Sequence, residues 1–452
     1  MMDALAVMPK YQAYKESGVD WLGSIPSNWQ MSKLKNTVNG CVNGLWGSEP
    51  NGKNEVVVRV ADFDDQKLKV SDAKLTYRSI TENERKERLL KNGDLLIEKS
   101  GGGEKTLVGR VVLFDKNYTA LTSNFVAKMS PKDWVDNRFL KYVFSCLYSR
   151  GINYLSIKQT TGIQNLDAGS YLNETFCFPE KMIQEEIANF LDNKTEQIDE
   201  AIAIKETQIE LLKERKQIII QKAVTQGLNL DVPMKDSGVE WIGQIPAHWE
   251  FSKLRYYTEI LSGYAFKSES YSNSPDDVPL LRGINVSPNH TRWNEVVYWP
   301  RTKIKGFENY QLEVGDLVIA MDRPWVSGGI RVAEISDKDI PCLLLQRVGR
   351  IRGINGLLTS YAKLLLSTDL FLNYFAPMLT GISVPYISPE QIQNFICPIP
   401  SVNEQEQIIE YIGSETGKIE AAIGQQKSQM ENLKEYKATL VNSAVTGKIK
   451  VA

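Results

Sequence analysis

The chain holds few residues whose types and spacing suit catalysis. Its only two histidines, His248 and His290, have no nearby partner at the spacing of a metal site or a catalytic triad. The run SGGGEKTLVG, which begins at residue 100, superficially suggests a phosphate-binding loop. Glu104 separates Gly103 from Lys105, however, so the G-x-x-x-x-G-K-[ST] spacing fails. We therefore expect no metal site here and a structural glycine-rich hairpin at this run.

The tetrapeptide DRPW at residues 322–325 is close to the Asp-Pro-Pro-Trp/Phe motif with which amino-methyltransferases hold a flipped base. Arg323 replaces the first proline of that motif, and no glycine-rich nucleotide loop accompanies it. The acidic pair at residues 276–277 lacks the downstream acidic-x-Lys of a nuclease. We therefore expect this chain to bind no cofactor and to catalyse no reaction.

A different group of side chains suits contact with nucleic acid. Cations and aromatic residues interleave between residues 292 and 305, a pattern that fits phosphate contacts and packing on sugars or bases. The same stretch also fits an ordinary half-buried hairpin with a solvated edge. The candidate DNA-contacting residues are Lys53, Arg78, Arg85, Lys99, Lys105, Arg292, Trp293, Arg301, Lys303, Arg323, Arg347 and Arg350.

Length and composition indicate a globular protein of more than one domain. The 452 residues are 42% hydrophobic and 24% charged. No apolar run is long enough to span a membrane, and the N-terminal residues do not have the pattern of a secretion signal. Five widely spaced cysteines, with Cys177 and Cys397 in matching strand-like contexts, indicate buried, reduced thiols. We expect a cytoplasmic protein.

The net charge of −2 is unusual for a DNA-binding chain, because phosphate neutralisation supplies most non-specific affinity. Residues 180–227 hold 7 basic and 10 acidic residues, and residues 401–447 hold 4 basic and 7 acidic residues. The acidity is thus concentrated in two segments with a helical pattern. Whole-chain charge is therefore a poor guide to the surface that meets DNA.

The chain is an internal repeat. Residues 15–35 are KESGVDWLGSIPSNWQMSKLK and residues 235–255 are KDSGVEWIGQIPAHWEFSKLR, at a constant offset of 220. A match this dense across rare residues such as tryptophan indicates duplication.

Two further segments repeat at an offset of 221. Steps of four and three residues, starting at Leu191 and at Ile412, meet an apolar residue at seven of ten positions in each copy. This 3.5-residue period predicts two long helices with a coiled-coil seam. The predicted seam residues are Leu191, Ile198, Ile202, Ile209, Leu212, Ile219, Ile412, Ile419, Ile423, Met430, Leu433 and Leu440.

The two helices are expected to pair with each other, and duplication favours an antiparallel pair because equal halves can then relate by a two-fold axis. The polar seam residues fall at matching places in both copies, as Lys205 with Gln426 and Lys216 with Lys437 show. Such residues could fix the register of the pair at some cost in stability. Alternatively, the lysines only extend from an imperfect seam toward water.

The two inserts between these repeats share a skeleton but differ in sequence. Both contain Gly-Asp-Leu, at residues 93–95 and 315–317, followed by a β-branched strand and a glycine cluster. Short alternating runs indicate strands, and FLKYVFSCLYS and LLTSYAKLLLS indicate helices with an apolar face. A shared scaffold with divergent loops is typical of two domains that recognise different targets.

Taken together, the GVxWxGxIPxxW repeats, the two variable inserts and the helices that end in AVTQG and AVTG resemble the specificity subunits of type I restriction–modification systems. The resemblance implies that each insert is a target recognition domain for one half of a split site in double-stranded DNA. It also implies that the helices are spacers that dock two modification subunits. Those subunits would bind S-adenosylmethionine and methylate adenine, and restriction (motor–nuclease) subunits would join them for cleavage.

The resulting fold class is α+β, with two mixed α/β target recognition domains separated by two long antiparallel coiled-coil helices and related by an internal pseudo-two-fold axis. The predicted segments are an N-terminal tail (1–16), recognition domain 1 (17–180), spacer helix 1 (181–227), a linker (228–236), recognition domain 2 (237–400), spacer helix 2 (401–447) and a C-terminal tail (448–452).

Two other classes of function stay open at this point. One is a coiled-coil scaffold whose inserts bind protein, and the other is a stand-alone DNA-binding regulator. A gel shift with and without a modification partner separates them, because the scaffold binds no specific duplex and the regulator binds tightly alone.

Overall fold

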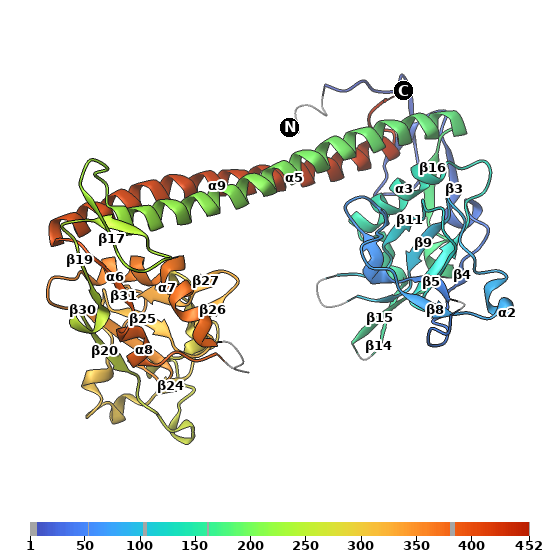
Figure 1. Cartoon of the computed structure of the whole chain (residues 1–452). Coiled ribbons are helices and arrows are strands. Elements are labelled where there is room, and N and C mark those ends of the chain that lie inside the picture. The colour runs from blue at the N-terminus through green and yellow to red at the C-terminus, as the bar shows by residue number, and fades with distance from the viewer. Residues whose placement is uncertain (1–6, 53, 103–105, 161, 380–384, 452) are drawn as a thin grey trace. The chain divides into compact units, whose positions relative to one another are not determined.

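The computed structural model describes residues 7–52, 54–102, 106–160, 162–379 and 385–451 (Figure 1). The chain divides into two compact units, Met1–Thr207 with Gln426–Ala452, and Gln208–Gln425. Both boundaries fall inside the long helices α5 (Lys181–Gln226) and α9 (Val402–Val445). Each unit therefore contains one insert and half of each long helix.

The first unit is a β-rich domain with short helices. Its largest sheet has the strand order β4-β13-β9-β11-β7-β6, and a second sheet has the order β12-β5-β8. Smaller sheets are β10-β15-β14, β16-β3 and β1-β2. The strands are β1 (Tyr14–Glu16), β2 (Ser24–Pro26), β3 (Gln30–Lys33), β4 (Val42–Asn43), β5 (Asn54–Val58), β6 (Phe63–Asp64), β7 (Lys69–Val70), β8 (Tyr77–Ser79), β9 (Leu95–Glu98), β10 (Ser100–Gly101), β11 (Val111–Leu113), β12 (Ala120–Thr122), β13 (Val126–Met129), β14 (Ile157–Thr160), β15 (Ile163–Leu166) and β16 (Thr175–Phe178). The helices are α2 (Glu82–Arg85), α3 (Asn137–Ser149) and α4 (Ala168–Tyr171).

The second unit has the same kind of frame with fewer strands. Its largest sheet has the order β20-β30-β25-β28, and β24-β21-β29 form a second sheet. The remaining pairs are β17-β18, β19-β31, β22-β23 and β26-β27. The strands are β17 (Met234–Asp236), β18 (Gln244–Pro246), β19 (Glu250–Lys253), β20 (Thr258–Ser262), β21 (Val278–Leu281), β22 (Val286–Ser287), β23 (His290–Thr291), β24 (Tyr298–Trp299), β25 (Leu317–Ala320), β26 (Trp325–Val326), β27 (Gly329–Ile330), β28 (Val332–Glu334), β29 (Leu343–Leu344), β30 (Val348–Gly353) and β31 (Ile396–Ile399). The helices are α6 (Thr359–Leu366), α7 (Asp369–Phe375) and α8 (Pro389–Gln393).

The repeated Gly-Asp-Leu forms the turn before the central strand of each unit. Gly93 and Gly315 adopt φ values of 100° and 89°, which side-chain-bearing residues rarely reach. The aspartate that follows each glycine closes the turn. Asp94 accepts a hydrogen bond from the backbone N–H of Lys91 at 2.7 Å, and Asp316 accepts one from the backbone N–H of Glu313 at 2.8 Å. This sequence pattern therefore starts the equivalent strands β9 and β25.

The two ends of each insert meet in one antiparallel pair of strands, β3 with β16 and β19 with β31. Cys177 lies opposite Met31 in the first pair, and Cys397 lies opposite Ser252 in the second. Both thiols are fully buried, and burial raises the pKa of each well above its ordinary value. They are structural thiols, as predicted, and each strand pair leads directly into a long helix.

The repeated IPxxW segments pack on the carboxyl ends of the long helices. In the first unit a Cβ atom on Gly447 would lie 2.4 Å from Pro26, and in the second a Cβ on Gly227 would lie 3.0 Å from the ring of Trp249. Both glycines also have positive φ, of 70° and 71°. The duplicated motif therefore requires glycine at each helix end, and this close approach explains why the two motifs recur together.

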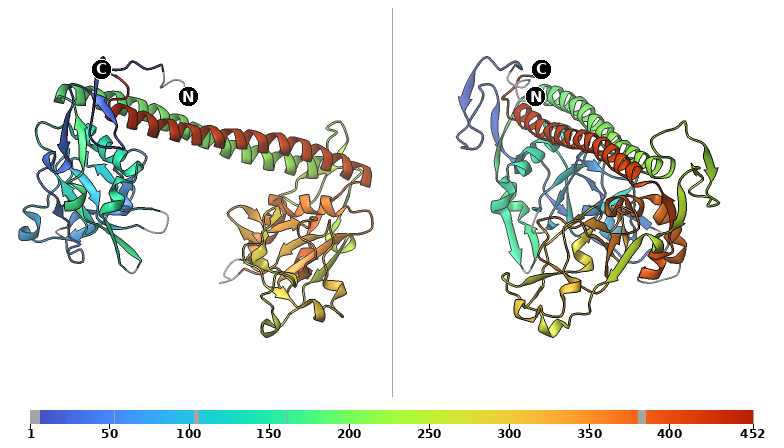
Figure 2. Two further views of the ribbon diagram at one scale, coloured as in Figure 1. Left: turned by 180° about the vertical axis from the view of Figure 1, so that it is seen from behind. Right: turned by 90° about the vertical axis from the view of Figure 1, so that its left-hand side faces the viewer.

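Helices α5 and α9 lie side by side in every view (Figures 1 and 2). In the first unit Lys437 forms an ion pair with Asp199 at 2.7 Å, and in the second Lys216 forms one with Glu420 at 2.6 Å. Late residues of one helix thus meet early residues of the other, so the helices are antiparallel. The predicted fold class of two α/β domains joined to a long antiparallel helix pair is confirmed.

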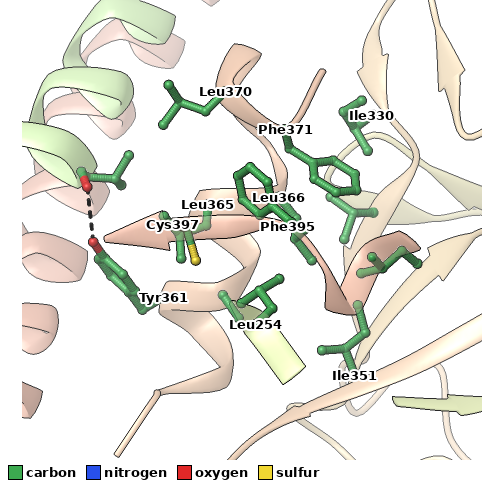
Figure 3. Packing of buried hydrophobic residues seen from close by; sticks show 14 of the residues in the cluster. Leu254, Ile330, Ile351, Tyr361, Leu365, Leu366, Leu370, Phe371, Phe395 and Cys397 are labelled. Atoms are coloured by element: carbon green, nitrogen blue, oxygen red, sulfur yellow. Dashed lines mark hydrogen bonds between the residues drawn. The ribbon is translucent and has the colours of Figure 1, made fainter. Parts of the chain in front are cut away.

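The core of the second unit joins its β-rich domain to the helices. Figure 3 shows Leu365, Phe371, Phe395 and Cys397 packed together between α6, α7 and β31. Tyr361 of α6 is fully buried, and its hydroxyl donates a hydrogen bond to the carbonyl oxygen of Val224 in α5 at 3.3 Å (Figure 3). The domain and its half of α5 therefore share one continuous apolar core.

Candidate nucleic-acid interface

A short arginine turn occupies the same place in both domains. In the first, Arg59 precedes the 3-10 turn Val60–Asp62, and its guanidinium lies 2.8 Å from a carboxylate oxygen of Asp62. The other oxygen of Asp62 accepts the backbone N–H of Arg59 at 2.8 Å. In the second domain, Asn285 accepts the backbone N–H of Arg282 at 3.0 Å in the same way. The turn follows β5 in one domain and β21 in the other.

Next to each arginine turn, a glycine lies against the end of a strand. A Cβ atom on Gly44 would lie 2.2 Å from the carbonyl oxygen of Thr122, and one on Gly263 would lie 2.1 Å from that of Leu345. No real side chain tolerates such distances from backbone atoms. The residue after each glycine makes an equivalent backbone hydrogen bond. The N–H of Leu45 donates to the carbonyl oxygen of Thr122 at 2.9 Å, and the N–H of Tyr264 donates to that of Leu344 at 3.0 Å.

The strand ends held in this way continue into one tight turn in each domain. We call these the β12–β13 turn (123–126) and the β29–β30 turn (345–348). The backbone N–H of Val126 donates to Ser123 at 3.0 Å, and that of Val348 donates to Leu345 at 3.2 Å. Both turns follow a strand that pairs in parallel with the strand before the arginine turn. The two domains therefore present a four-residue turn at the same place in the frame, although the third residue has a positive φ only in the second domain, at Arg347.

A second duplicated arginine fixes the loop next to each turn. Arg110 precedes β11 and donates to Glu98 at 2.8 Å, and its hydrogen bonds to that carboxylate raise its pKa. Arg331 precedes the equivalent strand β28 and is 9% exposed. It donates to the carbonyl oxygens of Val286 at 2.9 Å and Arg323 at 3.1 Å. Burial lowers the pKa of Arg331, although a guanidinium stays charged at neutral pH.

In the first domain these parts enclose an open cavity of about 730 Å³. Arg59 and Arg110 lie on its polar side, and Trp46 and Phe125 contribute aromatic rings. Trp46 is 39% exposed and Phe125 is 47% exposed, so both rings face solvent at the rim. Cavities of about 300–1,000 Å³ with apolar walls and a few polar groups are typical of ligand sites.

Two of the predicted DNA-contacting residues of the first domain already have partners. Arg78 lies 4.8 Å from the ring centre of Trp46 and forms an ion pair with Glu49 at 2.9 Å. Arg85 forms an ion pair with Glu55 at 3.1 Å. Arg78 therefore packs on a residue that lines the cavity, and its side chain is only 13% exposed.

Of the other three predicted cations of the first domain, the structure describes Lys99 alone. Lys99 donates to the side-chain oxygen of Asn43 at 2.7 Å, next to the β12–β13 turn. Lys53 and Lys105 lie outside the described residues.

In the second domain two predicted residues are part of the interior. Trp293 packs on the sheet core, and its indole N–H donates to Asp339 at 2.8 Å. Arg350 lies within β30, is 7% exposed, and donates to the carbonyl oxygen of Asn309 at 3.1 Å. The alternation of residues along the strand could not predict that Arg350 is buried, because β30 is buried on both faces over its first four residues.

Three predicted cations of the second domain are exposed. Arg292 donates to the carbonyl oxygen of Ile284 at 2.9 Å, at the edge of a small cavity over the arginine turn. Arg301 donates to the carbonyl oxygen of Asp276, and Lys303 lies two residues further along the same 3-10 turn. The turn that carries Arg301 and Lys303 follows β24 directly.

Arg323 and Arg347 are exposed and lie at neighbouring turns. Arg323 has φ 43° and Arg347 has φ 66°, a region that non-glycine residues rarely adopt. The backbone N–H of Met321, two residues before Arg323, donates to the carbonyl oxygen of Arg347 at 2.9 Å. Trp325, the next aromatic residue, is 48% exposed.

Most predicted seam residues are buried. Leu191, Ile198, Ile202 and Ile209 of α5, and Ile412, Ile419, Ile423, Met430 and Leu440 of α9, are all less than 9% exposed. Leu212, Ile219 and Leu433 are half-buried. In the last turns of α5 it is Ile220 and Val224 that enter the core of the second unit.

The polar seam positions are paired. Lys205 donates to Gln426, its counterpart at the offset of 221, at 3.0 Å. Lys437 donates both to Asp199 and to the carbonyl oxygen of Gln66 in the β6–β7 turn, each at 2.7 Å. These lysines therefore bind specific partners across the seam, which fits a role in register.

Sequence reasoning missed a duplicated buried glutamine. Gln184 and Gln405 are fully buried at an offset of 221, each five residues after a proline. Gln405 donates to the carbonyl oxygens of Pro400 and Gly356, both at 2.9 Å, and accepts the backbone N–H of Leu358 at 2.8 Å. The recurrence of one glutamine in two otherwise different segments was the available signal.

Within the described residues, no group of three histidine, cysteine or acidic side chains is placed to hold a metal ion, and no helix has the length and apolarity needed to cross a membrane. The geometry is that of an internally duplicated protein: two frames with matching turns, attached to a pair of long antiparallel helices.

Comparison with known proteins assigns this arrangement to a family. The family described as type I restriction modification DNA specificity domain matches twice, over residues 26–214 and 246–432. The chain belongs to this family, and it is a specificity subunit rather than a catalytic one, as predicted.

Relatives and solved structures agree with this assignment. The MjaVIII specificity subunit of Methanocaldococcus jannaschii is 28% identical over 367 residues, which is 81% of either chain. The EcoAI specificity subunit of Escherichia coli is 37% identical over 167 residues, covering 37% of this chain and 28% of that protein. A chain from a structural study of type I R-M complex assembly covers 93% of this chain and 98% of itself, with 14% identity and a TM-score of 0.68. The HsdS subunit from Thermoanaerobacter tengcongensis covers 96% of this chain and all of its own length, with 15% identity and a TM-score of 0.53.

Proposed function

We propose that each recognition domain, residues 17–180 and 237–400, binds one half of an asymmetric, bipartite site in double-stranded DNA. The observation that carries this proposal is the duplicated frame: the arginine turn, the strand-end glycine and the adjoining tight turn recur in both domains, whereas their exposed residues differ. Two equal frames with unequal surfaces fit two different half-sites.

The helices at residues 181–227 and 401–447 set the distance between the half-sites and dock two methyltransferase subunits. In this proposal S-adenosylmethionine and the catalytic residues for adenine methylation belong to those subunits, and restriction subunits join them for cleavage in the cytoplasm. The family membership supports this division of labour. The tails at 1–16 and 448–452 and the linker at 228–236 connect these parts.

The test is to map methylated adenines in DNA from cells that express this chain with its modification partners. Two domains on one face of B-DNA should be centred about one helical turn, or roughly 10–10.5 bp, apart. With a few base pairs recognised by each domain, the unread gap should be about 5–8 bp. A continuous or palindromic motif would contradict the proposal.

A further inference from the structure

The β12–β13 and β29–β30 turns are equivalent in their backbone contacts. The carbonyl oxygen of Phe125 accepts the N–H of Lys99 at 2.7 Å, and that of Arg347 accepts the N–H of Met321 at 2.9 Å. In each case the donor directly follows the central strand, β9 or β25, and that strand pairs with the strand after the turn. The tips of the two turns are therefore Asn124-Phe125 and Gln346-Arg347.

Two residues of the frame around these tips recur in both domains, but the tips themselves differ. Glycine recurs at the strand contact, as Gly44 and Gly263, because any Cβ atom would collide with the backbone. The arginine before the next strand recurs as Arg110 and Arg331. A supporting role would favour the same residue types at both tips, whereas recognition of different half-sites requires different ones.

The tip side chains are also available for a ligand. All four are exposed, and among the residues that the structure describes none of these side chains has a hydrogen bond or an ion pair. The predicted cations Arg78 and Arg350, in contrast, are held by Glu49 and by the carbonyl oxygen of Asn309. The tips therefore combine a fixed backbone with unengaged side chains.

Arg347 occupies a backbone conformation that favours other residues. It is the third residue of a four-residue turn and has φ 66°, a position at which glycine or asparagine is usual. An arginine there strains the backbone, and such strain is concentrated at functional sites. Among the described residues the guanidinium of Arg347 has no hydrogen bond or ion pair that would offset this strain.

The first tip adjoins the 730 Å³ cavity, to which Asn124 and Phe125 both contribute. The exposed ring of Phe125 lines this cavity together with Arg59 and Arg110, whose guanidinium groups are already paired with Asp62 and Glu98. An apolar ring beside a free amide suits the edge of a base pair, where a thymine methyl and an adenine edge lie together.

We infer that these tips carry the residues that discriminate bases: Asn124 with Phe125 for one half-site, and Gln346 with Arg347 for the other. The inference rests on the proposed function. Asn124 and Gln346 match the N6 and N7 edge of adenine, Arg347 matches the O6 and N7 edge of guanine, and Phe125 contacts a thymine methyl group. Because the tips belong to separate domains, each acts on its own half-site.

The experiment compares the full chain, assembled with its modification subunits, with the Arg347→Gly variant by methylation mapping and rate measurement. Glycine adopts φ 66° freely, so the thermal midpoint should be equal or higher. One guanine position of one half-site should become degenerate, with discrimination against the other bases falling about 5- to 150-fold. The other half-site should not change.

Three further variants complete the design. Asn124→Ala should relax a position in the opposite half-site. Lys338→Ala, which removes an exposed charge elsewhere in the second domain, should leave the motif intact. If Arg347→Gly lowers the thermal midpoint, Arg347→Lys replaces it, because lysine keeps the charge but loses the bidentate geometry.

The outcomes separate this inference from the proposed function. If the wild-type complex methylates a bipartite motif and both Arg347 variants keep the same motif and rates, the tips do not discriminate bases, and the proposed function stands. If the wild-type complex shows no bipartite motif, the proposed function itself is wrong.

Discussion

The side-chain amide of Gln405 is buried and binds three backbone groups. It bonds Pro400, Gly356 and Leu358, so it joins the start of α9 to the segment before α6. Replacement by leucine leaves these three backbone groups without a partner, and each buried unsatisfied group costs about 1–3 kcal/mol. We expect Gln405→Leu to lower the free energy of unfolding by about 3–5 kcal/mol in a denaturant titration, since single substitutions rarely cost more than about 5 kcal/mol. Gln407→Leu, an exposed position on the same helix, is the control and should change it little.

Glu404, one residue earlier, gives the second unit a measurable pH dependence. Burial alone would raise the pKa of its carboxyl group, but hydrogen bonds from Trp249, His248 and Ser401 lower it from 4.5 to about 2. A carboxyl group with a depressed pKa stabilises the fold above its unfolded pKa and loses that contribution as the pH falls through its folded value.

The stability advantage of the wild type over Glu404→Gln should therefore be complete above about pH 5 and should shrink between pH 4.5 and 2. Denaturant titrations of both proteins across that range measure it. An advantage that is constant with pH would show that the carboxylate charge plays no part.

Residue types alone could not separate free cations from engaged ones. Arg78 and Arg347 look equivalent in the sequence, yet one is fixed by Glu49, 29 positions away, and the other has no such partner among the described residues. Ion-pair partners are set by tertiary packing, which a list of cations does not contain.

At the scale of elements, the helices were the most predictable part. A 3.5-residue period depends only on residues close together in the sequence, and nine of the twelve seam residues that it predicts are buried. The three half-buried ones include Ile219, near the end of α5, where the helix turns a different face to the recognition domain and buries Ile220 instead. The seam period cannot report that second contact, because it comes from another element.

Replacing Ile209 and Leu212 with aspartate tests the seam of the helix pair. Ile209 is 6% exposed and Leu212 is half-buried. Core truncations cost about 2–5 kcal/mol, burial of a charge adds to that, and total stability is about 5–15 kcal/mol. The double variant should therefore melt at a much lower temperature or misfold, and specific DNA binding should collapse.

Glu206→Lys and Glu210→Lys are the controls, since both positions are exposed on the same helix, and they should cost little in stability. Thermal melting and duplex binding measure all three proteins. Unchanged melting and affinity in the aspartate variant would show that the helices do not pack through these residues.

At the scale of the whole chain, duplication explains why the order of the domains could be predicted from the sequence and the sheet topology within each domain could not. The tryptophan-rich repeats and the helix periods mark the domain boundaries, because each copy of the repeat packs on the glycine at the end of a long helix. The inserts between them share only the turns that support the frame. Their loops have diverged, so the sheet orders of the two units, six strands against four, did not follow from the repeat.

The independence of the two domains leads to a test on the intact protein. Each insert begins and ends in its own strand pair, β3 with β16 or β19 with β31, so an exchange at these borders leaves the other domain's frame untouched. Exchanging residues 17–180 for the corresponding insert of a relative should therefore change one half of the methylated motif and keep the other half. The gap between the halves should also stay the same, because the helices that set it are not exchanged.

Methylation mapping of the chimera with its modification partners measures all three features. A chimera in which both halves change together would show that the two domains do not recognise DNA independently.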